Sequence, residues 1–295
     1  MKIRNTFLFI FGLATVSTGN ILAEPLKLPA EWTQSIEPFR ITGPIYYVGT
    51  RGLGSYLLVS GSKAILIDTG LTENTALIEQ NILKLGLNLS DVKIILVSHA
   101  HWDHVGALAQ IQKNTGAKVF AMDKEVTALT TGKPTGDNIL QSFSYTPVKV
   151  DHILRDKEVI KMGKIHLKAT LTPGHTPGCT TWSTSLKEHG KTLKVVFPCS
   201  LSVAGNVLSN NQTYPGIVQD YQLSFRRLSK MPADIVLTSH PEAADLMNRK
   251  AKSEAGQLDA FTDRKLLEKL LKMLNFLLIS LLITRKNNIL KEPLS

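Results

Sequence analysis

The sequence contains very little cysteine, and it lacks both linkers and internal repeats. Only Cys179 and Cys199 occur among the 295 residues, which is too few for a closed structural zinc site with several cysteine ligands. No stretch rich in Pro, Ser or Gly divides the middle of the chain, and no segment recurs at the spacing of a repeat protein. We therefore expect one globular domain over residues 24–295.

Dense basic runs are also missing, although the formal net charge is +10. The lysines are scattered and are not interleaved with aromatic residues, and much of the excess positive charge lies after Asp263. A basic balance can indicate binding to nucleic acid or to an anionic membrane. This distribution is instead typical of a basic protein surface, and we expect no nucleic-acid partner.

The first 23 residues have the pattern of a secretory signal. Lys2 and Arg4 precede an apolar stretch from Phe7 to about Val16, and small and polar residues follow. The stretch is shorter than the ~20 residues that span a membrane, and a buried N-terminal helix is the alternative. We expect cleavage after Ala23 and a periplasmic mature protein that is not held at the membrane, because no cysteine follows to carry a lipid.

Strand and helix patterns alternate along the rest of the chain in two halves, each of which begins with β-rich sequence. Apolar or alternating runs such as SYLLVS and VKIILVSH predict strands, whereas ENTALIEQNILKLG has apolar residues at helical spacing. The stretch KEHG predicts a hairpin turn between CTTWSTS and TLKVVFP. This order favours an α/β fold in which two sheets pack face to face with helices outside.

The most informative stretch is LVSHAHWDHVG. Here His99, His101, Asp103 and His104 crowd into six positions directly after a predicted buried strand. A lone histidine at a strand end is usually capped or satisfied by a neighbour. Four metal-binding residue types at this spacing instead indicate a metal site.

Two more histidines follow the strand runs ATLTPG and DIVLTS. Loops beyond strand ends converge on one edge of a layered α/β core, where sites usually form. The candidates divide into two sets of three, namely His99, His101 and His175, and Asp103, His104 and His240. Two incomplete sets that share a hydroxide are typical of a two-metal hydrolase.

The motifs SHAHWDHVG, TPGHTPGCTTW and LTSHP resemble the metallo-β-lactamase superfamily. The span from about Phe39 to Met247 is similar to the dizinc β-lactamases of subclass B3. This resemblance implies an αββα four-layer sandwich, two Zn²⁺ ions held by the six candidate residues, and a monomer that acts on a small-molecule β-lactam. It further implies hydrolysis of penicillins, cephalosporins and carbapenems through a zinc-bridging hydroxide that Asp103 helps to orient, and hence antibiotic resistance.

The segment before the last histidine separates this branch from others. Glyoxalase II-like thioesterases and lactonases resemble one another in having a metal-bridging Asp there, whereas this chain has VVFPCSLSV. Ser200 and Ser202 match the serine pair of subclass B3, which implies a role in binding the substrate carboxylate. Strand-end capping is the other interpretation of these serines. A lactonase or thioesterase is the alternative function, and a non-catalytic scaffold is a third.

Cys179 and Cys199 lie at equal distances from the centre of the predicted hairpin turn. Opposed positions on a hairpin face each other, and an exported compartment is oxidising. We predict a Cys179–Cys199 disulfide, with two buried free thiols as the alternative. A shift of one residue turns a strand side chain to the other face, so we do not expect Cys199 beside Ser200 to be a metal ligand.

Three further segments carry weaker signals. Asp68 in IDTG is expected to brace the metal loops, and the irregular residues 132–147 are expected to border the active site. After about Ala255 the sequence departs from the family pattern. We expect an atypical Leu- and Lys-rich helix from about residue 262, packed on the domain, with membrane-surface association as a weaker hypothesis.

Overall fold

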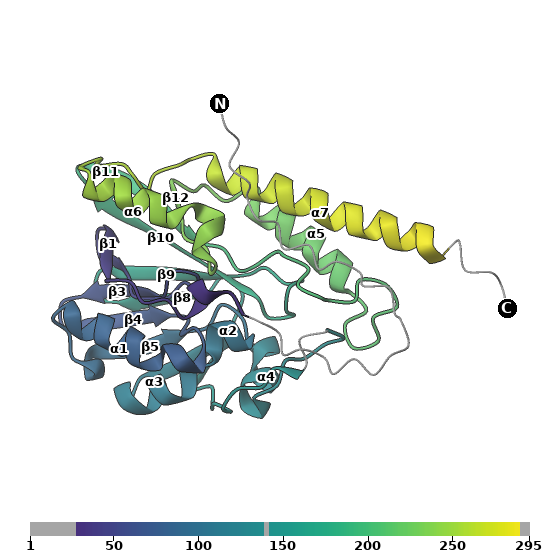
Figure 1. Ribbon diagram of the computed structural model, residues 1–295, viewed down its shortest axis with the longest axis horizontal. Helices are drawn as coiled ribbons and strands as arrows, with labels where there is room; N and C mark the ends of the chain where they lie inside the picture. The colour runs from purple at the N-terminus through teal and green to yellow at the C-terminus, as the bar shows by residue number, and fades with distance from the viewer. Residues whose placement is uncertain (1–27, 139–141, 290–295) are drawn as a thin grey trace.

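The computed structural model describes residues 28–138 and 142–289, with side chains up to residue 284. The predicted signal segment, residues 1–23, lies outside the described residues. Figure 1 shows two sheets stacked on each other, with one group of helices below them and another above. This arrangement confirms the αββα sandwich expected from the sequence.

The first sheet has seven strands in chain order, β1 to β7. Neighbours are antiparallel from β1 to β4 and parallel from β4 to β7. The run FRITGPIYY forms two strands, because the chain turns at Gly43 with φ +48°. The strands are β1 (Phe39–Thr42), β2 (Ile45–Tyr47), β3 (Tyr56–Ser60), β4 (Lys63–Ile67), β5 (Val92–Leu96), β6 (Lys118–Met122) and β7 (His152–Leu154).

Strand β4 shows why these segments read as continuous apolar runs. Ala64 and Leu66 pack into the core between this sheet and its helices, whereas Ile65 and Ile67 pack into the core between the two sheets. Successive strand side chains point to opposite faces, so burial on both faces requires apolar residues at every position. The helices of this half are α1 (Thr75–Lys84), α2 (Trp102–Val105), α3 (Leu108–Thr115) and α4 (Val126–Thr131).

The second sheet has five strands in the order β12, β11, β10, β9, β8. Its longest pairing is the predicted hairpin, which closes at His189 and Gly190, both with positive φ. Such two-residue turns match the twist of the flanking strands. The strands are β8 (Val159–Met162), β9 (Ile165–Leu171), β10 (Thr180–Glu188), β11 (Lys191–Phe197) and β12 (Ile235–Val236).

The outer face of the second sheet is covered by α5 and α7 (Figure 1). Leu271 and Leu278 of α7 are buried, and Leu278 lies in one apolar cluster with Ile217 and Tyr221 of α5. The Leu- and Lys-rich segment is therefore a helix packed on the domain. Among the described residues, no helix combines the length and apolar character needed to cross a membrane. The helices are α5 (Ile217–Leu228), α6 (Leu246–Glu254) and α7 (Leu266–Ile289).

Five short 3₁₀ turns connect these elements within the described residues. One lies before the first sheet and one just after the last strand, and both border the centre described below. They are η1 (Ala30–Trp32), η2 (Thr72–Asn74), η3 (Leu89–Asp91), η4 (Asp123–Glu125) and η6 (Pro241–Ala244).

Candidate metal centre

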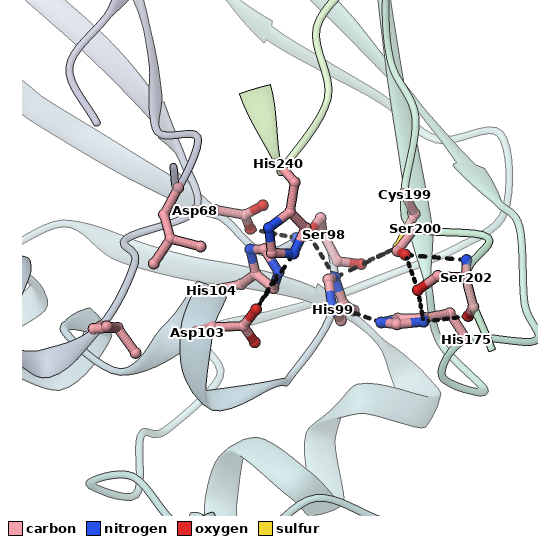
Figure 2. A network of polar contacts seen from close by, with 12 residues as sticks. Asp68, Ser98, His99, Asp103, His104, His175, Cys199, Ser200, Ser202 and His240 are labelled. Atoms are coloured by element: carbon pink, nitrogen blue, oxygen red, sulfur yellow. Dashed lines mark hydrogen bonds and ion pairs between the residues drawn. The ribbon is translucent and has the colours of Figure 1, made fainter. Parts of the chain in front are cut away.

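Three loops that follow β5, β9 and β12 meet at one edge of the two sheets. The first continues into α2, the second carries the PGH motif, and the third begins η6. Together they bring all six predicted residues into one cluster. These residues are His99, His101, Asp103, His104, His175 and His240. Figure 2 shows His99, Asp103, His104, His175 and His240 from close by.

The first set consists of three buried histidines. One nitrogen from each of His99, His101 and His175 lies within 4.8 Å of the others. The Nε2 atoms of His99 and His175 are only 3.2 Å apart. All three rings are almost inaccessible to solvent. Three imidazoles therefore point at one small buried volume.

The outer nitrogens of two of these rings are held by neighbouring oxygens. Nδ1 of His175 lies 2.8 Å from the carbonyl oxygen of Ser202, which can only accept, so Nδ1 carries the proton. Nδ1 of His99 lies 2.9 Å from Oγ of Ser98. The lone pair of His175 Nε2 is consequently directed at the centre, as in metal sites where the second ring nitrogen donates to a carbonyl.

The second set combines a carboxylate with two histidines. Oδ2 of Asp103 lies 3.1 Å from Nε2 of His104 and 3.4 Å from Nε2 of His240. The side chain of His240 is 28% exposed, whereas those of Asp103 and His104 are nearly buried. The centre therefore opens to solvent on the side of the second set.

Burial and mutual repulsion keep the first set neutral. Burial lowers the pKa of His99 and His175 well below the ordinary value, and neighbouring histidines lower it further. Burial likewise lowers the pKa of His101 to about 4. Burial alone would raise the pKa of Asp103, but His104 and His240 hold it well below its usual range. The first set therefore presents unprotonated imidazoles and Asp103 a carboxylate, the forms that bind a metal. The pKa of His104 is raised, because the attraction of Asp103 outweighs burial.

This donor set fits zinc. Two nitrogens that bind one zinc at 2.0–2.1 Å with tetrahedral angles are about 3.3 Å apart, close to the 3.2 Å between His99 and His175. Two lone pairs at that distance repel each other unless a cation or a proton lies between them. Three nitrogens on one side and Asp, His, His on the other would each leave a bound ion an open position, as catalytic sites do.

The two cysteines form a disulfide beside the first set. Cys179 and Cys199 are bonded, with their Cα atoms 5.8 Å apart. Sγ of Cys199 lies 3.7 Å from Nδ1 of His99, but a disulfide sulfur has no thiolate to offer a metal. The pairing is the predicted one, although the cysteines lie just beyond the ladder, which ends at the Trp182–Phe197 pair, rather than opposite each other within it.

The predicted serine pair lies at the edge of the first set (Figure 2). Oγ of Ser200 is 3.0 Å from Oγ of Ser202, and Oγ of Ser202 is 3.4 Å from Nδ1 of His175. Both serines are partly exposed. The carbonyl of Ser202 also orients His175.

Asp68 supports the loop after β5, which carries His99 and His101, as the sequence suggested. It is buried at the end of β4, and its Oδ1 accepts a hydrogen bond of 2.7 Å from the backbone N–H of Ser98. Its φ of +57° is a conformation that Asp adopts more readily than most residues. Burial raises the pKa of Asp68 to about 6, against the lowering effect of His104.

The irregular segment around residues 132–147 touches the metal loop, although residues 139–141 are not described. The Tyr145 hydroxyl donates to the carbonyl oxygen of Ala100, and Phe143 stacks on Trp102 with ring centroids 4.5 Å apart. The segment around residues 132–147 thus lies against the centre, as expected.

The ring centroid of Trp32 in η1 lies 5.5 Å from that of His240.

Several supporting residues were not predicted. Trp32, Glu125 and Asn206 all contact the loops of the centre, and Asn206 Nδ2 donates to the carbonyl oxygen of His175. None stands in a motif, because each acts through backbone groups or ring packing. For Glu125, the one available signal was its position directly before the short helix VTALTT.

Comparison with known proteins gives concordant matches. The family model described as the metallo-beta-lactamase superfamily matches residues 50–240. The chain is 29% identical over 135 residues to a probable metallo-hydrolase, YqgX, of Bacillus subtilis, covering 46% of this chain and 62% of that protein. It is 31% identical over 122 residues to the hydroxyacylglutathione hydrolase GloC of Haemophilus influenzae, covering 39% and 53%. The chain thus spans less than two thirds of these curated relatives.

Solved structures match over nearly their whole length. BJP-1, a subclass B3 metallo-beta-lactamase of Bradyrhizobium japonicum, is 35% identical with a TM-score of 0.84, covering 88% of this chain and 98% of that one. The FEZ-1 metallo-beta-lactamase from Legionella gormanii is 38% identical with a TM-score of 0.82, covering 86% and 98%.

Proposed function

This chain belongs to the metallo-β-lactamase superfamily, and on that premise we propose that it is a dizinc β-lactamase of the subclass B3 type. The family and its relatives support a hydrolase with a divalent-metal site. The observation that carries the finer proposal is the segment after β11. It brings Ser200 and Ser202 to the edge of the centre, where a carboxylate would favour a thioesterase or lactonase.

Each set of three residues would hold one zinc ion in this proposal. When bound, the two ions supply a hydroxide at neutral pH and an electrophile for the substrate carbonyl. The chain itself keeps the first three imidazoles neutral and pointed inward. These ligands are His99, His101 and His175 for the first ion, and Asp103, His104 and His240 for the second.

Asp103 has a second role because it is ionised and faces both histidines of its set. Its carboxylate can accept a hydrogen bond from the attacking water and so orient it toward the carbonyl carbon. The hydroxyls of Ser200 and Ser202 can donate to the carboxylate that β-lactam antibiotics carry. The side chain of His240 is 28% exposed, so such a substrate would enter from this side.

We also propose that the protein acts as a periplasmic monomer after removal of residues 1–23. The Cys179–Cys199 disulfide supports an oxidising compartment. In this setting, hydrolysis of β-lactams would confer antibiotic resistance on the cell. Fractionation of expressing cells and N-terminal sequencing of the mature protein test the location and the cleavage after Ala23.

The substrate class is tested with a panel. Purified zinc-loaded protein is assayed against imipenem, a chromogenic cephalosporin, a homoserine lactone and a glutathione thioester. We expect turnover of the two β-lactams that EDTA abolishes and added zinc restores. Turnover of the thioester or the lactone alone would replace the β-lactamase proposal with the alternative hydrolase.

A further inference from the structure

Glu125 is a buried acid that the proposed mechanism does not use. It is the last residue of η4, only 2% of its surface is exposed, and within the described part of the chain no cation pairs with it. Burial raises the pKa of its carboxyl group. Burying a carboxyl group costs free energy unless hydrogen bonds satisfy it, so Glu125 requires donors from neighbouring residues.

Both oxygens of Glu125 accept hydrogen bonds from loops of the metal centre. Oε2 accepts from the backbone N–H of Ala100 at 2.7 Å. Oε1 accepts from the hydroxyl of Thr176 at 2.5 Å and from the N–H of Gly178 at 2.8 Å. One side chain therefore joins the loop after β5 to the loop after β9.

The contacted positions lie next to the ligands of one set only. Ala100 stands between His99 and His101, and Thr176 follows His175. None of the three hydrogen bonds reaches Asp103, His104 or His240. Glu125 thus connects the two loops that together provide the first set. None of these hydrogen bonds holds a ligand of the second set.

Gly178 keeps the space that this carboxylate needs. A Cβ at Gly178 would lie 2.7 Å from Cγ, 2.8 Å from the backbone nitrogen and 2.8 Å from Oε1 of Glu125. Atoms so close must move, and backbone nitrogen cannot move cheaply. The second glycine of the PGHTPG motif therefore allows the loop to approach Glu125.

We propose that Glu125 is a positioning residue for the first metal site. By fixing Ala100 and the Thr176–Gly178 turn relative to each other, it holds the Nε2 atoms of His99 and His175 at their 3.2 Å separation. Ala100 is also held by Tyr145, whose hydroxyl donates to the carbonyl oxygen of Ala100. This inference rests on the proposed two-zinc centre.

The test compares zinc affinity at the two sites in wild type and Glu125→Gln. A glutamine has nearly the same shape, but its amide –NH₂ must face either the N–H of Ala100 or that of Gly178. We expect the affinity for one of two zinc ions, measured by competition with a chromophoric chelator, to fall about tenfold or more. The affinity for the other ion should change less than threefold.

A spectroscopic measurement assigns the affected site. In protein loaded with Co²⁺, we expect Glu125→Gln to alter the ligand-field bands of the all-histidine site and to leave those of the other ion unchanged. Thr176→Val, which removes one of the three donors, should give the same change in smaller degree. Gly178→Ala should reproduce it through steric displacement.

Leu129→Ala is the matched control for simple destabilisation. Leu129 lies on α4, is fully buried and makes no side-chain hydrogen bond to the metal loops. This variant should lose thermal stability while retaining wild-type affinity at both sites. Equal losses at both sites in Glu125→Gln, or the same selective loss in Leu129→Ala, would overturn the positioning role. A wild-type protein that binds no zinc would instead overturn the proposed function.

Discussion

The Nε2 atoms of His99 and His175 lie 3.2 Å apart, although 76 positions separate these residues in the chain. The contact exists because β5 and β9 belong to different sheets that meet at one edge. The backbone N–H of Thr180, at the start of β10, donates to the carbonyl oxygen of Ser98 and ties the two loops together. The candidate centre therefore forms only where loops from the two sheets meet.

Asp103 gives the most direct mutational prediction. Asp103→Asn keeps the shape of the side chain but removes the charge that faces His104 and His240. We expect zinc content to fall from about two ions to about one, and kcat/KM for a cephalosporin to fall at least about 100-fold. Atomic emission spectrometry and steady-state kinetics measure these effects. Asp123→Asn, on the surface, should behave as wild type in both assays.

Asp68 predicts a pH dependence of stability in the metal-free protein. Burial raises its pKa to about 6 in the folded state, so the folded protein binds this proton more tightly than the unfolded chain does. The contribution of Asp68 to stability is therefore largest below about pH 4 and declines as the pH rises to about 6.

The matched variant for that prediction is Asp68→Asn, which cannot titrate. Relative to the variant, wild type should lose about 2–3 kcal/mol of unfolding free energy between pH 4 and pH 7. Urea unfolding in the presence of EDTA measures it. A difference that stays constant across this range would contradict the buried, raised pKa of Asp68.

The disulfide predicts a stability effect without a loss of chemistry. Replacing Cys179 and Cys199 together by serine should lower the free energy of unfolding by about 2–4 kcal/mol, because the bond closes a loop of 20 residues. Zinc content should not change, since neither sulfur is a ligand in the proposed centre. Thiol titration of unreduced, denatured protein should find no reactive thiol, and two reactive thiols would show that the bond does not form.

Helix α7 offers a matched pair of substitutions. Leu278 is 2% exposed and packs against α5, whereas Phe276 on the same helix is 69% exposed. We expect Leu278→Ala to cost about 2–5 kcal/mol of stability and Phe276→Ala to change it by less than about 0.5 kcal/mol. Equal effects in thermal unfolding would mean that α7 does not pack as described.

The sequence predicted the six residues of the centre because their chemistry is visible in a short string and at two strand ends. The alternation of strands and helices also predicted the two sheets, since burial on both faces leaves long apolar runs. The strands β7 and β8 were not predicted because they are only three and four residues long and, unlike the equally short β2, do not stand in a longer apolar run. Such short segments carry too little periodicity to distinguish them from loops.

Residues that support the centre were harder to predict. Glu125 accepts hydrogen bonds from backbone N–H groups. Because almost every residue type offers such a group, the sequence does not distinguish Glu125 from other acidic residues. Cys179 and Cys199 lie beyond the last paired residues of the hairpin, Trp182 and Phe197, so the register of the ladder does not fix their positions. Such details depend on tertiary contacts rather than on local sequence.

The central claim, two zinc ions in two separate sets of three residues, is tested most directly by anomalous diffraction at the zinc absorption edge from zinc-loaded crystals. We predict two peaks, one about 2.0–2.1 Å from nitrogens of His99, His101 and His175 and the other at similar distances from Asp103, His104 and His240. A single peak, or a peak that contacts neither set, would contradict the account.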